Sequence, residues 1–336
     1  MNSSVIGIVL AAGKGTRMKS DIPKVLHEVF FAPMAHHVLD ALQHLSLSKT
    51  IVVTGHQNQR VEAALAEHAP LFVFQEKQLG TGHAVLACKE ALARHNGTVL
   101  ILCGDTPLVR PETLRLFLQR HQQEGAQLTV MTTVVPDPTN YGRIISDVHG
   151  RIVGIVEEKD ADQKQKNICE VNAGIYCVES ELLRDALQRL GTDNKQGELY
   201  LTDIVGIATA DGAKVQKYVC ADSDEVLGVN SRRELAEAHR VLQYRYLQGL
   251  MDSGVTIIQP ENVSIASSVA IGRDSVIHPF VSISGNTRIG TGVTIESFVT
   301  IHDSTVGDRV NVSAYCHLRN VSIGSHLTLQ AHTIET

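Results

Sequence analysis

The sequence lacks several features that would tie the protein to a particular compartment or partner. No apolar run is long enough to cross a membrane, and the run at residues 5–10 is too short for a signal peptide. With a formal net charge of −6, the chain has no basic surface for nucleic acid or an anionic membrane. The six cysteines form no CxxC pair, which is typical of reduced, mostly buried thiols. These absences predict a cytoplasmic protein that binds neither nucleic acid nor membranes.

Histidine is plentiful, but its sixteen copies show no HExxH motif and no paired ligand spacing. Each is therefore interpreted as a surface or core residue and not as a metal ligand. The composition is that of an ordinary globular protein, with 43% apolar and 20% charged residues. At 336 residues the chain is long enough for two domains, each with its own core.

A glycine-rich segment follows the first apolar run and predicts a phosphate-binding loop. Residues 5–10 read as a buried strand, and residues 11–18 continue Ala-Ala-Gly-Lys-Gly-Thr-Arg-Met. Gly13 and Gly15 let the backbone turn tightly and approach a ligand, so that loop N–H groups can point at phosphate oxygens. A strand-to-helix turn with a solvated basic face is the alternative. The cations that match a polyphosphate are Lys14, Arg17 and Lys24.

Met18 excludes two better-known phosphate loops. A P-loop would need glycine at that position before Lys19 and Ser20, and a dinucleotide fingerprint would need a third glycine or an alanine there. The remaining pattern is Leu-x-x-Gly-x-Gly-Thr-Arg followed by Pro23-Lys24. This pattern resembles the signature of the sugar-phosphate nucleotidyltransferases.

Alternating strand and helix patterns predict an α/β fold with a mixed, mainly parallel sheet over residues 1–230. The resemblance implies that this part is a Rossmann-like nucleotidyltransferase domain. The first half reads as strands at 5–10, 51–53, 71–74 and 98–102 and helices at 59–67, 83–94 and 111–123. The second half reads as less regular, antiparallel additions to the sheet. Its strands are expected at 128–134, 142–146, 152–156, 174–178 and 215–219.

The last hundred residues show a different sequence pattern. Ser231 and Glu234 form a capping box, which predicts a linker helix over 231–253 that ends at Gly254. Isoleucines then recur every six residues from 265 to 301, and the pattern continues with small register adjustments. This period predicts a truncated left-handed parallel β-helix of roughly four turns over 254–336. Proteins that this repeat resembles commonly trimerise side by side, so the resemblance implies a homotrimer, which the repeat itself does not show.

The strongest predicted strand ends in Cys103-Gly104-Asp105. A carboxylate there lies at the carboxyl edge of the sheet beside the phosphate loop and can hold Mg²⁺, which prefers carboxylates and substrate phosphates. The alternative is that Asp105 only caps the following turn. In the run 78–84, Gly80 allows close backbone approach, and Gln75 and Thr81 can hydrogen-bond a base edge. A capped helix start is the alternative for this run.

Three polar clusters, at 140–144, 157–160 and 170–174, offer donors and acceptors to a carbohydrate with hydroxyl and acetamido groups. Taken alone, each would read as a loop or turn. Asn230 places an amide oxygen just before the capped helix, which alone would read as turn chemistry.

Together these segments resemble, in the same order and over the whole chain, the bacterial bifunctional N-acetylglucosamine-1-phosphate uridyltransferase/glucosamine-1-phosphate acetyltransferase family. The resemblance implies transfer of uridylyl from UTP to N-acetylglucosamine-1-phosphate, giving UDP-N-acetylglucosamine and pyrophosphate, with Mg²⁺ as cofactor. The segments that carry it are 10–18, 23–27, 78–84, 104–105, 141–144, 197–203 and 228–230.

The resemblance also implies the role of each site residue. Arg17 and Lys24 would be catalytic and neutralise the phosphates, and Asp105 and Asn230 would hold Mg²⁺. The residues implied to contact the nucleotide are Leu10, Ala11, Ala12, Gly13, Gln75, Gly80 and Thr81. Those implied to contact the sugar, its phosphate or the ribose are Cys103, Gly104, Gly142, Glu157, Asn172 and Asn230. Cys103 departs from the family, where an aromatic residue commonly precedes Gly-Asp.

In the resembling family the acetyltransferase site lies in later β-helix coils and a C-terminal tail. The sequence stops at Thr336 within the repeats, which indicates a truncated chain, with a naturally short protein as the alternative. We therefore expect no acetyl transfer by these residues. Three other functions stay open: a nucleotidyltransferase for another sugar or nucleotide, a non-catalytic β-helix trimer that binds a sugar nucleotide, and a purely structural scaffold.

Overall fold

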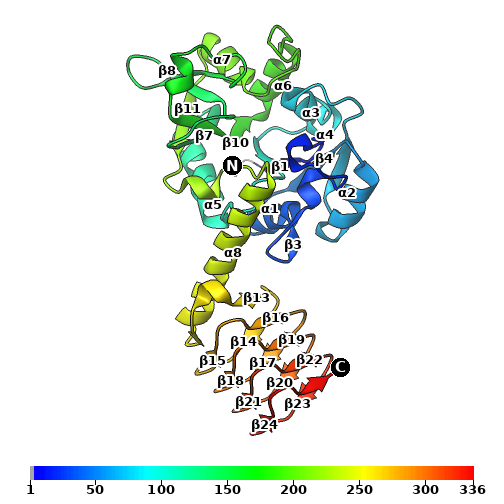
Figure 1. Cartoon of the computed structure of the whole chain (residues 1–336). Helices are drawn as coiled ribbons and strands as arrows, with labels where there is room; N and C mark the ends of the chain where they lie inside the picture. The colour runs from blue at the N-terminus through cyan, green and yellow to red at the C-terminus, as the bar shows by residue number, and fades with distance from the viewer. Residues whose placement is uncertain (1–3) are drawn as a thin grey trace. The chain divides into compact units, whose positions relative to one another are not determined.

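The computed structural model describes residues 4–336, and the chain forms two compact units (Figure 1). The first comprises Met1–Glu28 and Ala32–Glu234, and the second comprises Val29–Phe31 and Leu235–Thr336. No helix of the described chain is both long and apolar enough to span a membrane. All six cysteines are free thiols, and four of them are buried, as the sequence predicts.

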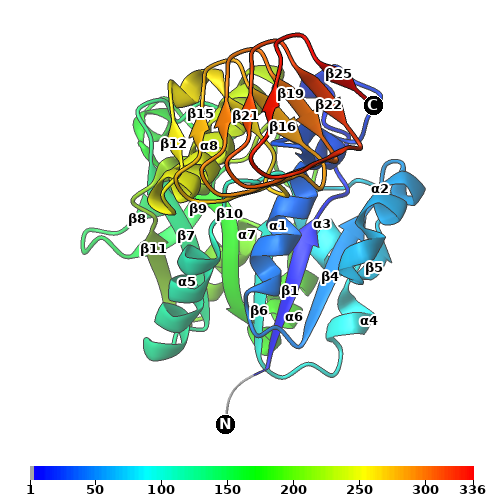
Figure 2. The same cartoon turned by 90° about the horizontal axis from the view of Figure 1, so that it is seen from below.

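A nine-stranded mixed sheet organises the first unit, in the order β11-β7-β10-β6-β1-β4-β5 with β8 and β9 attached beside β10. Figure 2 shows β6, β1, β4 and β5 side by side. β1 pairs in parallel with β4 and β6, whereas β10 is antiparallel to both β6 and β7, so the predicted mixed, mainly parallel sheet is confirmed. The strands are β1 Val5–Leu10, β4 Lys49–Thr54, β5 Leu71–Phe74, β6 Thr98–Cys103, β7 Leu128–Val134, β8 Arg143–Ser146, β9 Ile152–Val156, β10 Glu170–Glu179 and β11 Val215–Val219.

Two apolar cores cover the two faces of this sheet. β1 is buried on both faces, and its alternating side chains divide between the cores: Ile6 and Ile8 enter one, Val5 and Val9 the other. The first core is closed by α3, α6 and α7, and the second by α1, α2 and α5. The helices are α1 Met34–Gln43, α2 Asn58–Leu65, α3 Thr81–Leu86, α4 Lys89–Leu92, α5 Pro111–Gln123, α6 Ser180–Gln188 and α7 Asp203–Ala210.

Several elements differ from those expected. The helix predicted over 83–94 is divided into α3 and α4 by a break at Ala87-Cys88, and α1, α6 and α7 were not predicted. Short elements lie in the loops of the chain before α8, and Val29 of β2 belongs to the second unit. They are the 3₁₀ helices η1 Thr16–Met18, η2 Lys24–Leu26, η3 Ala66–His68, η4 Gln165–Asn167 and η5 Ser223–Glu225, and the two-residue strands β2 Glu28–Val29 and β3 Ala32–Pro33.

The long helix α8, Arg232–Asp252, begins with the predicted capping box. Glu234 N–H donates to Ser231 Oγ at 3.3 Å, and Ser231 N–H donates to Glu234 Oε2 at 2.8 Å. In the second unit, Phe30 N–H donates to His239 Nδ1 at 3.1 Å, so the segment Val29–Phe31 packs on α8. The sequence did not predict this contact, because it joins residues about two hundred positions apart.

The rest of the second unit is the predicted left-handed β-helix, with three parallel sheets around one apolar core. The ladders are β12-β15-β18-β21-β24, β13-β16-β19-β22-β25 and β14-β17-β20-β23, and η6 Pro260–Asn262 lies in the first coil. The strands are β12 Thr256–Ile257, β13 Ser264–Ile265, β14 Ala270–Ile271, β15 Val276–Ile277, β16 Ser282–Ser284, β17 Arg288–Ile289, β18 Thr294–Ile295, β19 Thr300–His302, β20 Thr305–Val306, β21 Asn311–Val312, β22 His317–Arg319, β23 Ser322–Ile323, β24 Thr328–Leu329 and β25 Ile334–Glu335.

The strand pairing explains the register adjustments in the repeat. Ile283 pairs with Ile301, which is a full hexapeptide coil, but Ile301 pairs with Leu318, one residue fewer. The missing residue lies at one corner of the prism, between β19 and β20 and again between β22 and β23. Asp303 and Asn320 occupy that corner with positive φ angles of 44° and 55°. The shortened corners keep Val306, Leu318 and Ile323 in the core.

A column of stacked rings follows another corner of the β-helix. Phe280, Phe298, Tyr315 and His332 lie one above the next, with ring centroids 5.0, 5.1 and 5.0 Å apart. Each of these residues has φ between 62° and 64°, so the same backbone corner recurs in four coils. The side chains of Phe280, Phe298 and Tyr315 are each about half exposed. We call these four residues the aromatic column.

Candidate active site

In the loop after β1, the backbone at Gly15 packs against Lys24 of η2. Gly15 has φ 62°, and a Cβ there would lie 2.5 Å from Lys24 Cβ. Glycine is therefore required both for the left-handed turn and for the contact with η2. This contact explains why the glycine-rich run and Pro23-Lys24 occur together in the sequence, because the loop must fold back to bring Lys24 beside it.

Lys24 joins the two residues that the sequence predicts as metal ligands. Its Nζ forms an ion pair with Asp105 Oδ2 and donates to Asn230 Oδ1 at 2.6 Å. Arg17 Nη2 donates to the same Asn230 oxygen at 2.7 Å. Only 12% of the Lys24 side chain and 20% of the Asp105 side chain are exposed, so the ion pair is well shielded from solvent. Two cations and two oxygen ligands thus meet at one point.

Asp105 and Asn230 are held in place by backbone contacts. Gly104 N–H donates to Leu10 O at 2.9 Å, which fixes the turn after β6 against the end of β1. Val229 N–H donates to Asp105 O at 2.8 Å, and Asn230 Nδ2 donates to Gly228 O at 2.8 Å. Since the amide nitrogen of Asn230 is thereby occupied, its oxygen faces Lys24 and Arg17.

The segment before α3 forms one wall of the same site. Gln75 is buried, and its Nε2 lies 3.2 Å from Gly80 O and 2.9 Å from His83 Nδ1. Thr81 Oγ1 accepts a hydrogen bond from Leu201 N–H at 3.0 Å, which leaves its own proton as a donor. These contacts fix the loop that carries Gly80.

Gly80→Ala is expected to destabilise this wall and weaken nucleotide binding. Gly80 has φ 108° and ψ 174°, a conformation open essentially to glycine alone, and a Cβ would lie 2.5 Å from Leu199 O. The backbone strain alone costs about 1–3 kcal/mol. Thermal unfolding and UTP titration calorimetry measure the two effects.

Gly206→Ala is the matched control for this substitution. Gly206 is exposed in α7, and nothing lies within 4 Å of a Cβ built there. That variant should gain up to about 1 kcal/mol of stability from helix propensity. A Gly80→Ala protein as stable as the wild type would contradict the steric argument.

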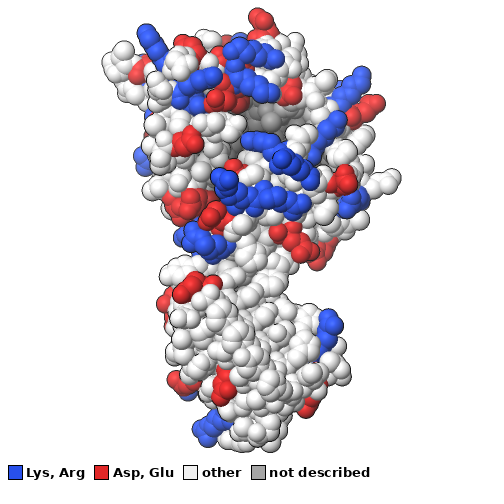
Figure 3. Space-filling model, viewed as in Figure 1, with Lys and Arg blue, Asp and Glu red and all other residues white. Residues whose placement is uncertain are grey.

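These walls enclose a pocket of about 700 Å³ at the carboxyl ends of β1 and β6. On the face drawn in Figure 3, lysine and arginine side chains gather around a hollow in the first unit. The predicted residues that line the pocket are Leu10, Ala11, Ala12, Gly13, Lys14, Gly15, Arg17, Lys24, Gln75, Gly80, Thr81, Cys103, Asp105 and Asn230.

The remaining predicted residues lie outside this pocket. Gly104 contributes its backbone to the turn below Asp105. Gly142, Glu157 and Asn172 form a second cluster: a Cβ on Gly142 would lie 3.5 Å from Glu157 Oε2 and 3.6 Å from Asn172 Cβ. Cys103 lines the pocket and also approaches β10, the strand that carries Asn172, since its Sγ lies 3.9 Å from Gly174 O.

Arg143 is a buried residue that holds the loop of Gly142 in the second cluster. It is 1% exposed, its Nη2 lies 2.5 Å from Glu158 Oε2, and its Nη1 donates to Tyr141 O. Because Arg143 ties Tyr141, next to Gly142, to Glu158, next to Glu157, its part in the 141–144 run is to position that loop.

Burial determines the protonation of the groups in this region. It raises the pKa of the Cys103 thiol to about 12, helped by the Asp105 carboxylate, although Lys24 opposes the shift. The thiol is therefore neutral and unsuited to act as a nucleophile. Burial also raises the pKa of Glu157, which accepts a hydrogen bond from Thr202 Oγ1 at 3.1 Å.

Sequence reasoning left several pocket residues without a role. Gln78 and Ala84 belong to the 78–84 run, and Glu198 belongs to the 197–203 run, so membership of those runs was the available signal. The lining residues that had no assigned role are Thr16, Val25, Gln78, Ala84 and Glu198.

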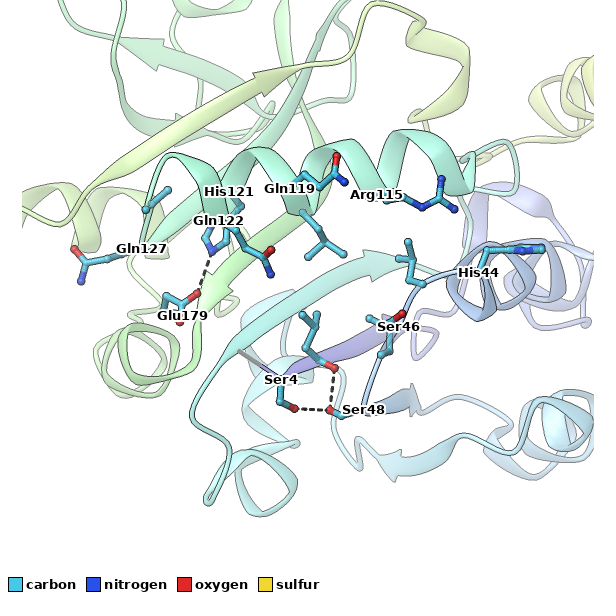
Figure 4. A pocket seen from close by; sticks show the side chains of 16 residues that line it. Ser4, His44, Ser46, Ser48, Arg115, Gln119, His121, Gln122, Gln127 and Glu179 are labelled. Atoms are coloured by element: carbon cyan, nitrogen blue, oxygen red, sulfur yellow. Dashed lines mark hydrogen bonds and ion pairs between the residues drawn. The ribbon is translucent and has the colours of Figure 1, made fainter. Parts of the chain in front are cut away.

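A second hollow of about 940 Å³ lies near the start of β1 (Figure 4). It is larger, but the amino ends of parallel strands are not where ligands gather in doubly wound sheets. Its buried His121 is fully engaged, with Nδ1 2.8 Å from Thr129 Oγ1 and Nε2 3.1 Å from Glu179 Oε1. The pocket beside Lys24 is therefore the candidate active site.

Comparisons with known proteins identify the family of each part of the chain. Residues 7–198 match the model of the MobA-like NTP transferase domain, and residues 268–303 match the bacterial transferase hexapeptide model of six repeats. The chain is 46% identical to the bifunctional protein GlmU of Desulfotalea psychrophila, over 98% of this chain and 97% of that protein.

Other relatives are longer than this chain. The chain is 49% identical to the bifunctional protein GlmU of Geobacter metallireducens, but that match spans 89% of this chain and 63% of the relative. Among solved structures, one from Bacillus anthracis, described as a "putative glucose-1-phosphate thymidylyltransferase", matches with a TM-score of 0.58 over 71% of this chain and 95% of that one. At 20% identity this likeness concerns the fold alone.

Proposed function

The chain belongs to the family of bifunctional GlmU proteins and is a nucleotidyltransferase, and from this premise we propose that it transfers uridylyl from UTP to N-acetylglucosamine-1-phosphate. The products would be UDP-N-acetylglucosamine, a precursor of peptidoglycan and lipopolysaccharide, and pyrophosphate. The observation that carries the proposal is the junction of Lys24 with Asp105 and Asn230, inside a pocket floored by the glycine-rich loop.

In this reaction an oxygen of the sugar phosphate attacks the α-phosphorus of UTP and pyrophosphate leaves. The sugar phosphate is already a competent nucleophile, so no general base is required of the protein. Arg17 and Lys24 bring positive charge to the phosphates, where it stabilises the charge that develops on the phosphoryl oxygens and the leaving group. The loop at Leu10–Gly13 and the wall at Gln75 and Thr81 orient the nucleotide for in-line attack.

The donor set at this junction suits Mg²⁺, which we propose as the cofactor. Asp105 Oδ2 and Asn230 Oδ1 both contact one Nζ atom, so two oxygens already converge on a single cationic group. Carboxylate, amide and phosphate oxygens are the ligands that Mg²⁺ prefers. When bound by Asp105 and Asn230, the ion supplies charge neutralisation for the phosphates.

A pyrophosphate-release assay tests the proposal directly. With N-acetylglucosamine-1-phosphate as acceptor, UTP should give far higher turnover than ATP, GTP or CTP. With UTP, the same acceptor should exceed glucose-1-phosphate and glucosamine-1-phosphate. Preference for another pair would reassign the enzyme within the nucleotidyltransferases. No release with any pair would favour a sugar-nucleotide-binding protein without catalysis.

The Glu157 variant tests the sugar side of the site. If its carboxylate accepts hydrogen bonds from sugar hydroxyls, KM for the sugar phosphate should rise as pH falls through the raised pKa of Glu157. Glu157→Gln should raise that KM about tenfold at neutral pH and abolish this pH dependence. Steady-state kinetics between pH 5 and pH 8 provide the measurement.

Glu157→Gln should increase the stability of the protein at neutral pH, even though it weakens binding of the sugar phosphate. Because folding raises its pKa, the stabilising contribution of Glu157 is present below its unfolded pKa and is lost as pH rises through the folded value. Glu157→Gln should therefore be more stable than the wild type at neutral pH. A variant that is less stable there would show that the charged carboxylate is favoured by its surroundings.

We also propose that the β-helix assembles three copies of the chain, which its hexapeptide repeats support. Sedimentation velocity should give three times the chain mass of 36.5 kDa. Residues 1–336 are expected to release no CoA from acetyl-CoA with glucosamine-1-phosphate, and detection of free thiol would overturn that expectation.

A further inference from the structure

Two histidines that are 32 residues apart in the sequence meet on the first unit, away from the nucleotide pocket. His68 Nε2 lies 3.1 Å from His36 Nδ1. Glu67 Oε1 lies 2.9 Å from the same His36 nitrogen and 3.8 Å from His68 Nε2. Three atoms that can each offer a lone pair therefore face one another between α1 and η3.

The triangle of these atoms has the size of one face of a zinc coordination tetrahedron. The point in their plane that is equidistant from the three atoms lies about 1.9 Å from each. In a regular tetrahedron with metal–ligand bonds of about 2.05 Å, the centre of each face also lies about 1.9 Å from its three ligand atoms. An ion just outside the plane would thus contact all three atoms at normal bond lengths. The Glu67 side chain is 70% exposed, so a fourth position is open to water.

Surrounding groups fix the histidine tautomers that ligation needs. His36 Nε2 lies 3.0 Å from Ala64 O, so this nitrogen carries the proton and Nδ1 keeps its lone pair. His68 Nδ1 faces the Gln43 amide at 3.1 Å and the Asp40 carboxylate at 3.7 Å. Turning the amide by half a rotation presents its oxygen to an Nδ1 proton and frees His68 Nε2 for a metal.

The two segments that carry the ligands are rigidly placed. Val38, Leu39 and Leu42 of α1 pack in the same core as Val61 and Leu65 of α2, which η3 follows directly. The imidazoles themselves are largely covered, with 14% of the His36 side chain and 6% of the His68 side chain exposed. The site is therefore preorganised.

We propose that His36, Glu67 and His68 bind one transition-metal cation of the Zn²⁺ class, with water as the fourth ligand. Two imidazoles and one carboxylate suit zinc, whereas Mg²⁺ prefers the oxygen-only set at Asp105 and Asn230. The ion cross-links α1 to the turn after α2 and stabilises the first unit. The proposal differs from the sequence analysis, which interpreted each histidine as a surface or core residue, because the two histidines come from segments that only the fold brings together.

Zinc titration of the whole chain tests the site. Protein stripped of metal and held in excess Mg²⁺ should take up one Zn²⁺ per chain in competition with a chromophoric chelator. His68→Gln should weaken binding by at least about 100-fold, and Glu67→Gln by at least about tenfold. His44→Gln, an exposed histidine at the end of α1, should bind as the wild type does, and so should Cys169→Ser, which removes the exposed thiol.

Two further readouts separate ligation from folding. Co²⁺ should give the intense visible absorption of tetrahedral coordination in the wild type and not in His68→Gln. Zn²⁺ should raise the unfolding temperature of the wild type and leave that of His68→Gln unchanged. If His68→Gln fails to fold, Glu67→Gln decides the question, because its side chain is exposed. Equal zinc affinity in these variants and the wild type, or loss of binding in Cys169→Ser, would overturn the proposal.

Discussion

Asp105→Ala is expected to lower turnover by at least about 10³-fold. The substitution removes a carboxylate ligand of the proposed Mg²⁺ site and also the charge that holds Lys24 at the junction with Asn230. Lys24 then keeps only the neutral amide oxygen as a partner and no longer has a fixed position against the phosphates. Pyrophosphate release under saturating UTP, sugar phosphate and Mg²⁺ measures the loss.

Folding must be checked separately for this variant. Asp105 is four-fifths buried beside a cation, so its loss should lower the unfolding free energy by roughly 1–3 kcal/mol, which leaves a folded protein. Asp193→Ala, an exposed aspartate of the same unit, should match the wild type in both respects. Turnover within tenfold of the wild type in a folded Asp105→Ala protein would remove Asp105 from the metal site.

Lys24→Ala should lower kcat by about 10²–10³-fold, with a smaller effect on KM for UTP. The ammonium group is nearly buried and bound to two oxygen ligands, so it is already oriented before substrate arrives. Charge that is fixed in this way acts on the transition state at little reorganisation cost. Steady-state kinetics with both substrates varied separate kcat from KM.

Lys89→Ala is the matched control for Lys24→Ala, because Lys89 is an exposed lysine on α4, outside the pocket. Its kinetics should equal those of the wild type. Lys24→Arg should recover only part of the rate, since a planar guanidinium cannot reach both Asp105 Oδ2 and Asn230 Oδ1 as a single point of charge. A kcat reduced less than tenfold in Lys24→Ala would contradict its catalytic role.

The β-helix could be predicted in detail because each coil repeats one local rule. An aliphatic residue every six positions places Ile277, Ile283 and Ile289 on the three walls of one coil, and burial of all three follows from the period alone. The shortened corners were visible only as a shift in spacing. Their cause, one residue fewer at the corner occupied by Asp303 and Asn320, required the strand pairing.

The first unit was less predictable where short helices compete with loops. α1 begins directly after Pro33 and its apolar residues Met34, Val38 and Leu42 follow a helical period, so the signal was present but not used. The predicted helix over 83–94 contained no glycine or proline to mark the break at Ala87-Cys88. Propensity alone therefore did not reveal the break.

The candidate active site was predictable where motifs lie at strand ends. Asp105 and the glycine-rich loop follow adjacent parallel strands, so their proximity follows from topology. The ion pair of Lys24 with Asp105 could not be predicted, since it depends on the fold of the loop between Gly15 and Lys24. Nor could the grouping of Gly142, Glu157 and Asn172, which comes from the antiparallel part of the sheet.

The aromatic column can be used to follow the unfolding of the β-helix. Its rings are spaced by about the 4.8 Å that separates neighbouring strands, so the rings of two coils can touch only while those coils remain paired. A tryptophan placed at Phe298 or Tyr315 would report by its fluorescence on the separation of one particular pair of coils. Heating should then reveal whether the solenoid melts stepwise from the coil that ends at β25 or in a single event.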